Sequence, residues 1–257
     1  MADKTNFNQD KNNRWKITFL IMLLFSSLIL LLNLEPIMQS SKYHLFADSR
    51  HYTFIPNFFD VVTNLPFLLI GIYGFWYCRQ STPKPTANAW IVMFLGIALV
   101  SLGSAYYHWQ PSYDTLFWDR LPMTVAFMAL FVAILSEYIS EKLASALLPA
   151  VILGMASVIY WYFSNDLRLY FWIQLAPLLS ISAVMLLFKS RYSHQWLLLA
   201  ALTFYFLAKI TEFYDEQVFL WTYEILSGHS IKHLLASASC YCILVMLKHR
   251  KAIGISC

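Results

Sequence analysis

The sequence predicts an all-α integral membrane protein with eight membrane-spanning helices. Hydrophobic residues make up 59% of the 257 residues and charged residues only 12%, whereas soluble domains average about 45–50% and about 25%. The mean hydropathy is +0.56. Apolar runs long enough to cross a bilayer, which takes about 17–25 residues, recur along the whole chain. Because the runs are continuous and do not alternate in polarity, they indicate helices and not the strands of a membrane barrel.

The two ends of the chain are polar. Residues 1–14 are rich in Asn and Lys, and we expect a disordered cytoplasmic N-terminus there. The apolar run at 15–34 exceeds the roughly 7–15 apolar residues of a secretory signal, and no small-residue cleavage site follows it. We therefore expect a retained transmembrane helix. Residues 248–257 predict a basic cytoplasmic tail.

Seven further helices are expected after a polar loop. Their ranges are 60–78, 87–109, 114–138, 142–163, 167–188, 195–214 and 229–247. Polar connectors separate them, such as QSTPKPTAN, whose two prolines stop helices. Pro122 falls in the early turns of its helix, where proline is tolerated.

The distribution of positive charge orients these helices. If both termini are cytoplasmic, twelve of the 18 Lys and Arg residues lie on the cytoplasmic side, in agreement with the positive-inside rule. The other six lie in outer loops and helix ends: Lys42, Arg50, Arg120, Arg168, Lys209 and Lys232. The net charge of +4 is small and scattered, so no nucleic-acid partner is indicated.

Five polar side chains fall in one layer of this topology, near the non-cytoplasmic face. Ser104 and His108 lie one helical turn apart at the end of one helix. Asp119 begins the next helix, and His229 and His233, again one turn apart, begin the last. Ionisable groups inside a membrane are costly and usually functional. Their arrival at one depth from distant segments predicts a metal site.

The residue types suit hydrolytic zinc chemistry. Catalytic zinc commonly takes three protein ligands and a water, and His108, His229 and His233 can supply the three. Neutral imidazoles leave the ion its full charge, which lowers the pKa of bound water to about 7. Asp119 would move the proton as a general acid and base, and Ser104 would hydrogen-bond the water or the developing oxyanion.

Each feature taken alone also has a structural explanation. Ser104 can bond to its own helix, and Asp119 can cap a helix or pair with Arg120. Two histidines at a helix end can bind water or lipid headgroups. Three acidic residues lie at or just after the end of the helix expected at 195–214: Glu212, Asp215 and Glu216. They either support the histidines or end a solvated helix.

The order and spacing of these residues resemble the alkaline ceramidases. The matching pattern is S-x-x-x-H, an Asp eleven residues after that His, and H-x-x-x-H in the last helix. The segment FFDVVTNLPFLL, residues 58–69, is similar to the first helix of that family. The resemblance covers residues 48–247. It implies a seven-transmembrane-helix hydrolase bundle, of the superfamily that includes the adiponectin receptors, preceded here by one extra helix.

The resemblance also implies an activity and a cofactor. The zinc ligands would be His108, His229 and His233, with Asp119 and Ser104 as catalytic residues. The reaction would be hydrolysis of the N-acyl bond of a ceramide-like lipid to a sphingoid base, or another amine, and a fatty acid. A divergent or bacterial-type member is indicated, because the acidic calcium-binding segment of the eukaryotic enzymes has no counterpart in ADSRHYTFIPN. Calcium is therefore not expected, and the lipid stays open.

A second hypothesis remains beside the enzyme. The chain could be a receptor-like or scaffolding member of the same superfamily that binds zinc with little or no turnover. The presence of Asp119 and Ser104 favours the enzyme. Both hypotheses predict a multi-pass protein whose partners are a lipid and the bilayer.

Overall fold

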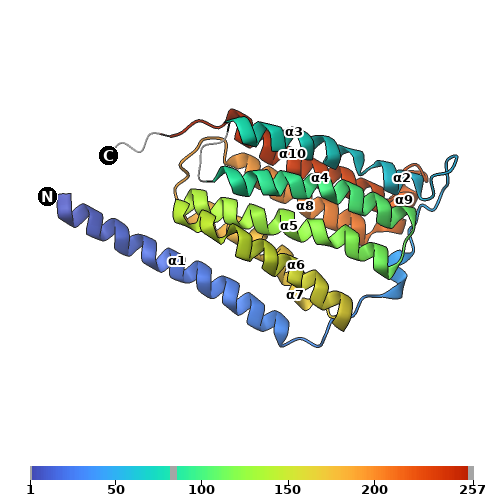
Figure 1. Cartoon of the computed structure of the whole chain (residues 1–257), viewed down its shortest axis with the longest axis horizontal. Helices are drawn as coiled ribbons and strands as arrows, with labels where there is room; N and C mark the ends of the chain where they lie inside the picture. Colours follow the sequence, from blue (N-terminus) through green and yellow to red (C-terminus); the bar gives the residue numbers. More distant parts are fainter. Residues whose placement is uncertain (1, 82–85, 254–257) are drawn as a thin grey trace.

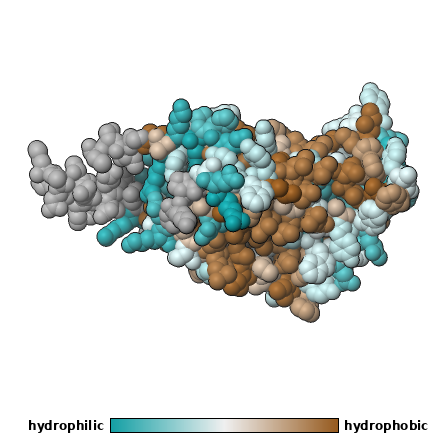
Figure 2. Space-filling view, turned by 45° about the horizontal axis from the view of Figure 1, so that its top comes forward, coloured by the Kyte–Doolittle hydropathy of each residue, from teal (hydrophilic) through white to brown (hydrophobic). Residues whose placement is uncertain are grey.

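The computed structural model describes residues 2–81 and 86–253, and this part of the chain contains helices and no β-sheet. Eight of the described helical segments are long and apolar enough to cross a membrane. Figure 2 shows hydrophobic residues gathered over the middle of one face, with hydrophilic residues toward the ends. The predicted all-α membrane class is confirmed.

Long helices run side by side along one axis (Figure 1). They are α1 (Ala2–Leu32), α3 (Leu65–Ser81), α4 (Ala87–Trp109), α5 (Tyr113–Tyr138), α6 (Leu147–Ser164), α7 (Arg168–Leu187), α8 (Trp196–Phe213) and α10 (Gly228–His249). Short helices lie in the connections: η1 (Ser41–His44), α2 (Phe58–Val62), η2 (Glu141–Ala146) and α9 (Asp215–Trp221). The most extensive packing joins α4 to α3 and α5, and α8 to α10.

The first helix differs from the prediction at its start. It begins at Ala2, inside the segment expected to be disordered. Residues 2–14 contain no Gly or Pro, and extending a helix that already exists costs far less than starting one. Figure 1 shows α1 at the edge of the bundle, where it packs against α7. The loop that follows it crosses the end of the bundle.

The helix expected at 60–78 is broken in two. It ends at Val62 as α2 and resumes at Leu65 as α3. Pro66 explains the break, because proline lacks an N–H and its ring clashes with the carbonyl group four residues earlier, which here belongs to Val62. The break leaves the hydroxyl of Thr63 on the inside of the bundle, 8% exposed.

Two glycines bring helices into close contact beside the predicted site. A β-carbon on Gly103 would meet the carbonyl oxygen of Trp118, so α4 and α5 touch there. A β-carbon on Gly228 would meet the carbonyl oxygen of Thr211, so α10 and α8 touch as well. These contacts hold the end of α4 against α5 and the start of α10 against α8.

Candidate metal centre

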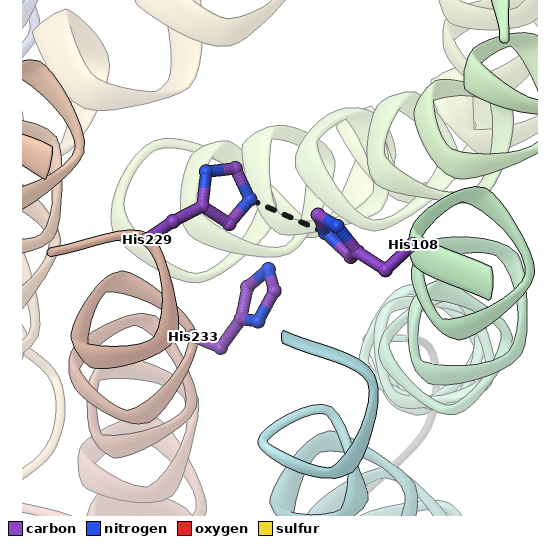
Figure 3. A group of neighbouring side chains, drawn as sticks. All are labelled: His108, His229 and His233. Carbon is purple, nitrogen blue, oxygen red and sulfur yellow. Dashed lines mark hydrogen bonds between the residues drawn. The ribbon is translucent and has the colours of Figure 1, made fainter. Parts of the chain in front are cut away.

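Three buried histidines meet where α4 ends and α10 begins (Figure 3). His108 lies in the last turn of α4, and His229 and His233 lie one turn apart in α10. All three are at most 5% exposed. Each offers one ring nitrogen, and the three nitrogens lie within 4.8 Å of one another. The predicted histidines are therefore brought together into one cluster that can bind a metal ion.

The cluster fits a metal that prefers imidazole ligands. The Nε2 atoms of His108 and His229 lie 3.2 Å apart. Two nitrogens bound to one tetrahedral zinc ion, each at about 2.0–2.1 Å, would lie about 3.3 Å apart. Three neutral imidazoles without a carboxylate among them are a donor set that suits zinc and other late transition metals.

Neighbouring segments fix the position of each histidine. Nδ1 of His233 lies 3.0 Å from Oγ1 of Thr63. The backbone N–H of His229 donates to Oδ1 of Asp215, at 2.7 Å, and the Asn57 side chain donates to the carbonyl oxygen of His108, at 2.8 Å. Such outer contacts orient metal ligands and raise metal affinity.

An aromatic side chain covers the cluster on its outer side. The Phe46 ring lies 4.7 Å from the His108 ring and 5.1 Å from the His229 ring, between centroids. The backbone N–H of the next residue, Ala47, donates to Asp215 at 3.1 Å. The loop between α1 and α2 thus closes the outer side of the cluster with an apolar group.

On the inner side lies a cavity of about 420 Å³. Ser104, Asp119 and His233 line one part of it. The Ser104 hydroxyl lies beside the Asp119 carboxylate. Both predicted catalytic residues therefore face the same space as one of the histidines. Asp119 forms no ion pair with Arg120 among the described residues.

Two lysines and one glutamate form a cluster on the wall of this cavity. Glu212 accepts from Lys209 at 2.8 Å and from Lys232 at 3.0 Å. Lys232 Nζ also lies 2.8 Å from Nε2 of His229. A metal bound to His229 would use the lone pair that this lysine contacts. Burial raises the pKa of Tyr43, so its hydroxyl stays protonated and donates to Glu212.

A second, apolar cavity of about 120 Å³ adjoins the first between the helices. Five residues line both cavities: Phe67, Val100, Met123, Tyr205 and Ala236. The remaining lining is almost wholly aliphatic, aromatic or sulfur-containing. The polar chamber beside the histidines therefore adjoins a space that suits a hydrocarbon chain.

Some functional neighbours were not predicted. Thr63 carries no signal in the sequence, because its position depends on the break at Pro66. Lys232 does carry a signal in the sequence, because a lysine between two histidines at the start of an apolar helix is unusual. Of the three acidic residues after the seventh helix, Glu212 and Asp215 contact the site, whereas Glu216 is exposed.

The segment ADSRHYTFIPN, for which the sequence predicts no calcium site, contains one buried carboxylate. Asp48 is buried, and its carboxylate forms a two-pronged ion pair with Arg50, at 2.7 and 2.6 Å. Hydrogen bonding to Asp48 raises the pKa of Arg50. The Arg50 guanidinium is thus already paired with the carboxylate that a calcium ion would need.

The comparison with protein families gives one match. The family model described as Ceramidase matches residues 47–254, which is more than half of the chain and includes the three histidines, Ser104 and Asp119. No curated protein matches the chain.

Proposed function

Because the chain belongs to the ceramidase family, we propose that it is a zinc-dependent membrane amidohydrolase that cleaves the N-acyl bond of ceramide or a related lipid. The products would be a sphingoid base, or another amine, and a fatty acid. One observation carries the proposal. Three histidine nitrogens come together beside a polar chamber that Ser104 and Asp119 also line, and an apolar cavity adjoins this chamber.

The three histidines would hold the zinc ion. When bound, zinc acts as a Lewis acid and lowers the pKa of its bound water to about 7. Thr63 keeps one nitrogen of His233 occupied and leaves the other free to act as a ligand. Phe46 excludes bulk water on the outer side, so substrate would arrive from the cavity side.

Asp119 would transfer the proton, and Ser104 would assist it by hydrogen bonding. Asp119, as a carboxylate, accepts the proton of the attacking water and returns it to the leaving nitrogen. While Asp119 is charged, the Ser104 hydroxyl donates to it. Once Asp119 is protonated, it can donate to Ser104 in return, which releases the hydroxyl proton to stabilise the oxyanion on the former carbonyl. One hydrogen bond thus reverses as the reaction proceeds.

The two cavities would divide the substrate at the amide bond. The apolar cavity would take the acyl chain, because burying hydrocarbon there is favourable and the cavity offers few polar partners. The larger chamber, which carries the charged groups, would take the amine side. A membrane lipid presents these two parts at the depth where the helices end.

The orientation in the membrane also belongs to the proposal. Twelve of the 18 basic residues lie on the side of both termini when those termini are cytoplasmic. His108 ends α4 and His229 begins α10, so both lie at the opposite end of the bundle. The active site would then open near the non-cytoplasmic face.

Fatty acid release from purified protein tests the proposal. The full chain is incubated with ceramides, other N-acylated lipids and ester lipids, free fatty acid is measured by mass spectrometry, and zinc is measured by elemental analysis. We expect release from N-acyl lipids with about one zinc ion per chain. His233→Ala should lose both, and His249→Ala, at the other end of α10, should keep both. Bound zinc with no lipid cleaved would support the receptor-like alternative instead.

A further inference from the structure

Arg120 is a buried cation without a counterion. It is 4% exposed and forms no ion pair in the described part of the chain. Its Nη2 donates to Gln39 Oε1 at 2.6 Å, whereas its Nη1 is buried with no hydrogen-bond partner among the described residues. The guanidinium lies 4.2 Å from the Trp161 ring centroid and 4.8 Å from that of Tyr170.

This arrangement is costly unless a ligand completes it. A buried charge is strongly unfavourable when it is not paired, and aromatic faces offset only part of that cost. Arg120 also lines the 420 Å³ cavity. The Arg120 side chain therefore borders a space that a ligand can enter. An anion is the ligand that would pair with it, in a charge-assisted hydrogen bond.

The chamber as a whole carries an excess of one positive charge. Its lining includes three cations, Arg120, Lys209 and Lys232, against two carboxylates, Asp119 and Glu212. Glu212 is shared by both lysines. Neither carboxylate forms an ion pair with Arg120 among the described residues. In a space of low dielectric constant, this excess favours an anion and disfavours a cation.

The position of Arg120 indicates which part of the substrate would carry the anion. Arg120 follows Asp119 directly in α5 and lines the same chamber. It lines the polar chamber and is not among the residues that line the apolar cavity. An acyl chain in the apolar cavity would leave the amine side of the lipid in the chamber, toward Arg120.

We propose that Arg120 binds an anionic headgroup, so that the substrate is an N-acylated lipid with a phosphate, sulfonate or carboxylate on its amine side. This inference rests on the proposed amidohydrolase function and adds a substrate class to it. The source of the anion is the lipid headgroup and not a free ion, because the apolar cavity adjoins the same chamber.

A binding experiment tests the anion site without turnover. Zinc-loaded full-length protein in neutral detergent is titrated with hexadecyl phosphate, hexadecanol and inorganic phosphate. We expect hexadecyl phosphate to bind at least about tenfold more tightly than the other two, because only this ligand joins an anion that can bond to Arg120 to a hydrocarbon chain that fits the apolar cavity. Arg120→Gln should remove this preference, and Arg120→Lys should restore part of it. Arg191→Gln, an exposed arginine that pairs with Glu141 at the other end, is the matched control.

The outcomes separate the possibilities. Equal affinity for phosphate and alcohol would overturn the proposal, as would a preference that survives in Arg120→Gln, which would indicate phosphate binding to the metal alone. Inorganic phosphate binding as tightly as hexadecyl phosphate would overturn the headgroup assignment in favour of a free anion. Zinc content and the melting temperature of each variant show whether the fold is kept.

A turnover experiment separates this inference from the proposed function. Ceramide and ceramide 1-phosphate with the same acyl chain differ only in the anion. We expect a kcat/KM about 10- to 100-fold higher for the phosphate, and Arg120→Gln should lower that ratio toward one. Equal cleavage of both lipids, lowered equally by Arg120→Gln, would overturn the headgroup site and leave the amidohydrolase intact. If neither lipid is cleaved but phosphate binding still depends on Arg120, the proposed headgroup site stands and the proposed amidohydrolase function is overturned.

Discussion

The Nδ1 atom of His233 lies 3.0 Å from the Oγ1 atom of Thr63, and that oxygen lies 2.6 Å from the carbonyl oxygen of Phe59. The Thr63 hydroxyl has one proton, which it donates to Phe59. It therefore accepts a hydrogen bond from an N–H at Nδ1. This contact holds His233 in the tautomer whose Nε2 carries a free lone pair, as a metal ligand requires.

Replacing Thr63 should therefore weaken metal binding. Thr63→Val keeps the shape of the side chain and removes the hydroxyl, so we expect zinc affinity to fall about 10- to 100-fold, the usual effect of losing a partner of a ligand. Zinc affinity is measured by competition with a chelator. Thr203→Val is the matched control, because the Thr203 hydroxyl is exposed and bonds only to its own helix. An unchanged affinity in Thr63→Val would show that the hydrogen bond does not orient His233.

Removing the charge of Asp119 should separate metal binding from turnover. Asp119→Asn keeps the size of the side chain and leaves the histidines intact, so zinc should be retained. Turnover should fall about 10²- to 10⁴-fold, because no group then accepts the proton of the water. Asp114→Asn, one to two turns earlier in the same helix and bonded to Tyr162, should retain activity. Near-full activity in Asp119→Asn would rule out its role in proton transfer.

Narrowing the passage between the two cavities should change the preferred acyl chain. Ala236 lines both cavities, so Ala236→Phe would fill the passage. We expect kcat/KM to fall by about tenfold or more for ceramides with long acyl chains and to change little for those with short ones. Ala238→Phe, in the same helix but outside both linings, is the control. A uniform loss across chain lengths would indicate that the acyl chain does not lie in the apolar cavity.

The sequence predicts the helices well because their signal is local. Residues 87–109 form α4 as expected, and residues 167–188 differ from α7 by one residue at each end. The meeting of His108 with His229 and His233 is also predictable, because charge topology places the ends of their helices in one layer. Distances and partners within that layer depend on packing, and the sequence does not contain them.

Features that depend on a break or on a third segment could not be predicted. Thr63 reaches His233 only because Pro66 interrupts the helix. Phe46 covers the histidines only because the loop after α1 folds back across the bundle. From the sequence, Arg120 is expected to pair with Asp119, because the two residues are adjacent. In the structure they point to different neighbours, as successive residues of a helix do.

The anchoring of α1 should depend on pH through Asp166. Asp166 pairs with Arg168 at 2.8 Å, and Arg168 donates to the carbonyl oxygens of Leu32, at 2.8 Å, and Leu34, at 2.6 Å. Hydrogen bonds from Arg168 hold the pKa of Asp166 below its ordinary value, which is about 3.9. A carboxyl group with a lowered folded-state pKa stabilises the folded protein above the ordinary pKa, and this stabilisation is lost as the pH falls through that value toward the folded pKa.

Asp166→Asn removes that stabilisation at every pH. We expect its Tm in detergent to be a few degrees below that of the native chain at pH 7 and at pH 5. The two values should converge as the pH falls below about 4, because the native Asp166 then becomes protonated as well. Thermal unfolding at several pH values measures this. Acidification protonates the native Asp166 and removes its ion pair with Arg168, so the difference in Tm should shrink. A difference that stays constant from pH 7 to pH 2 would show that the ionised form of Asp166 does not anchor α1.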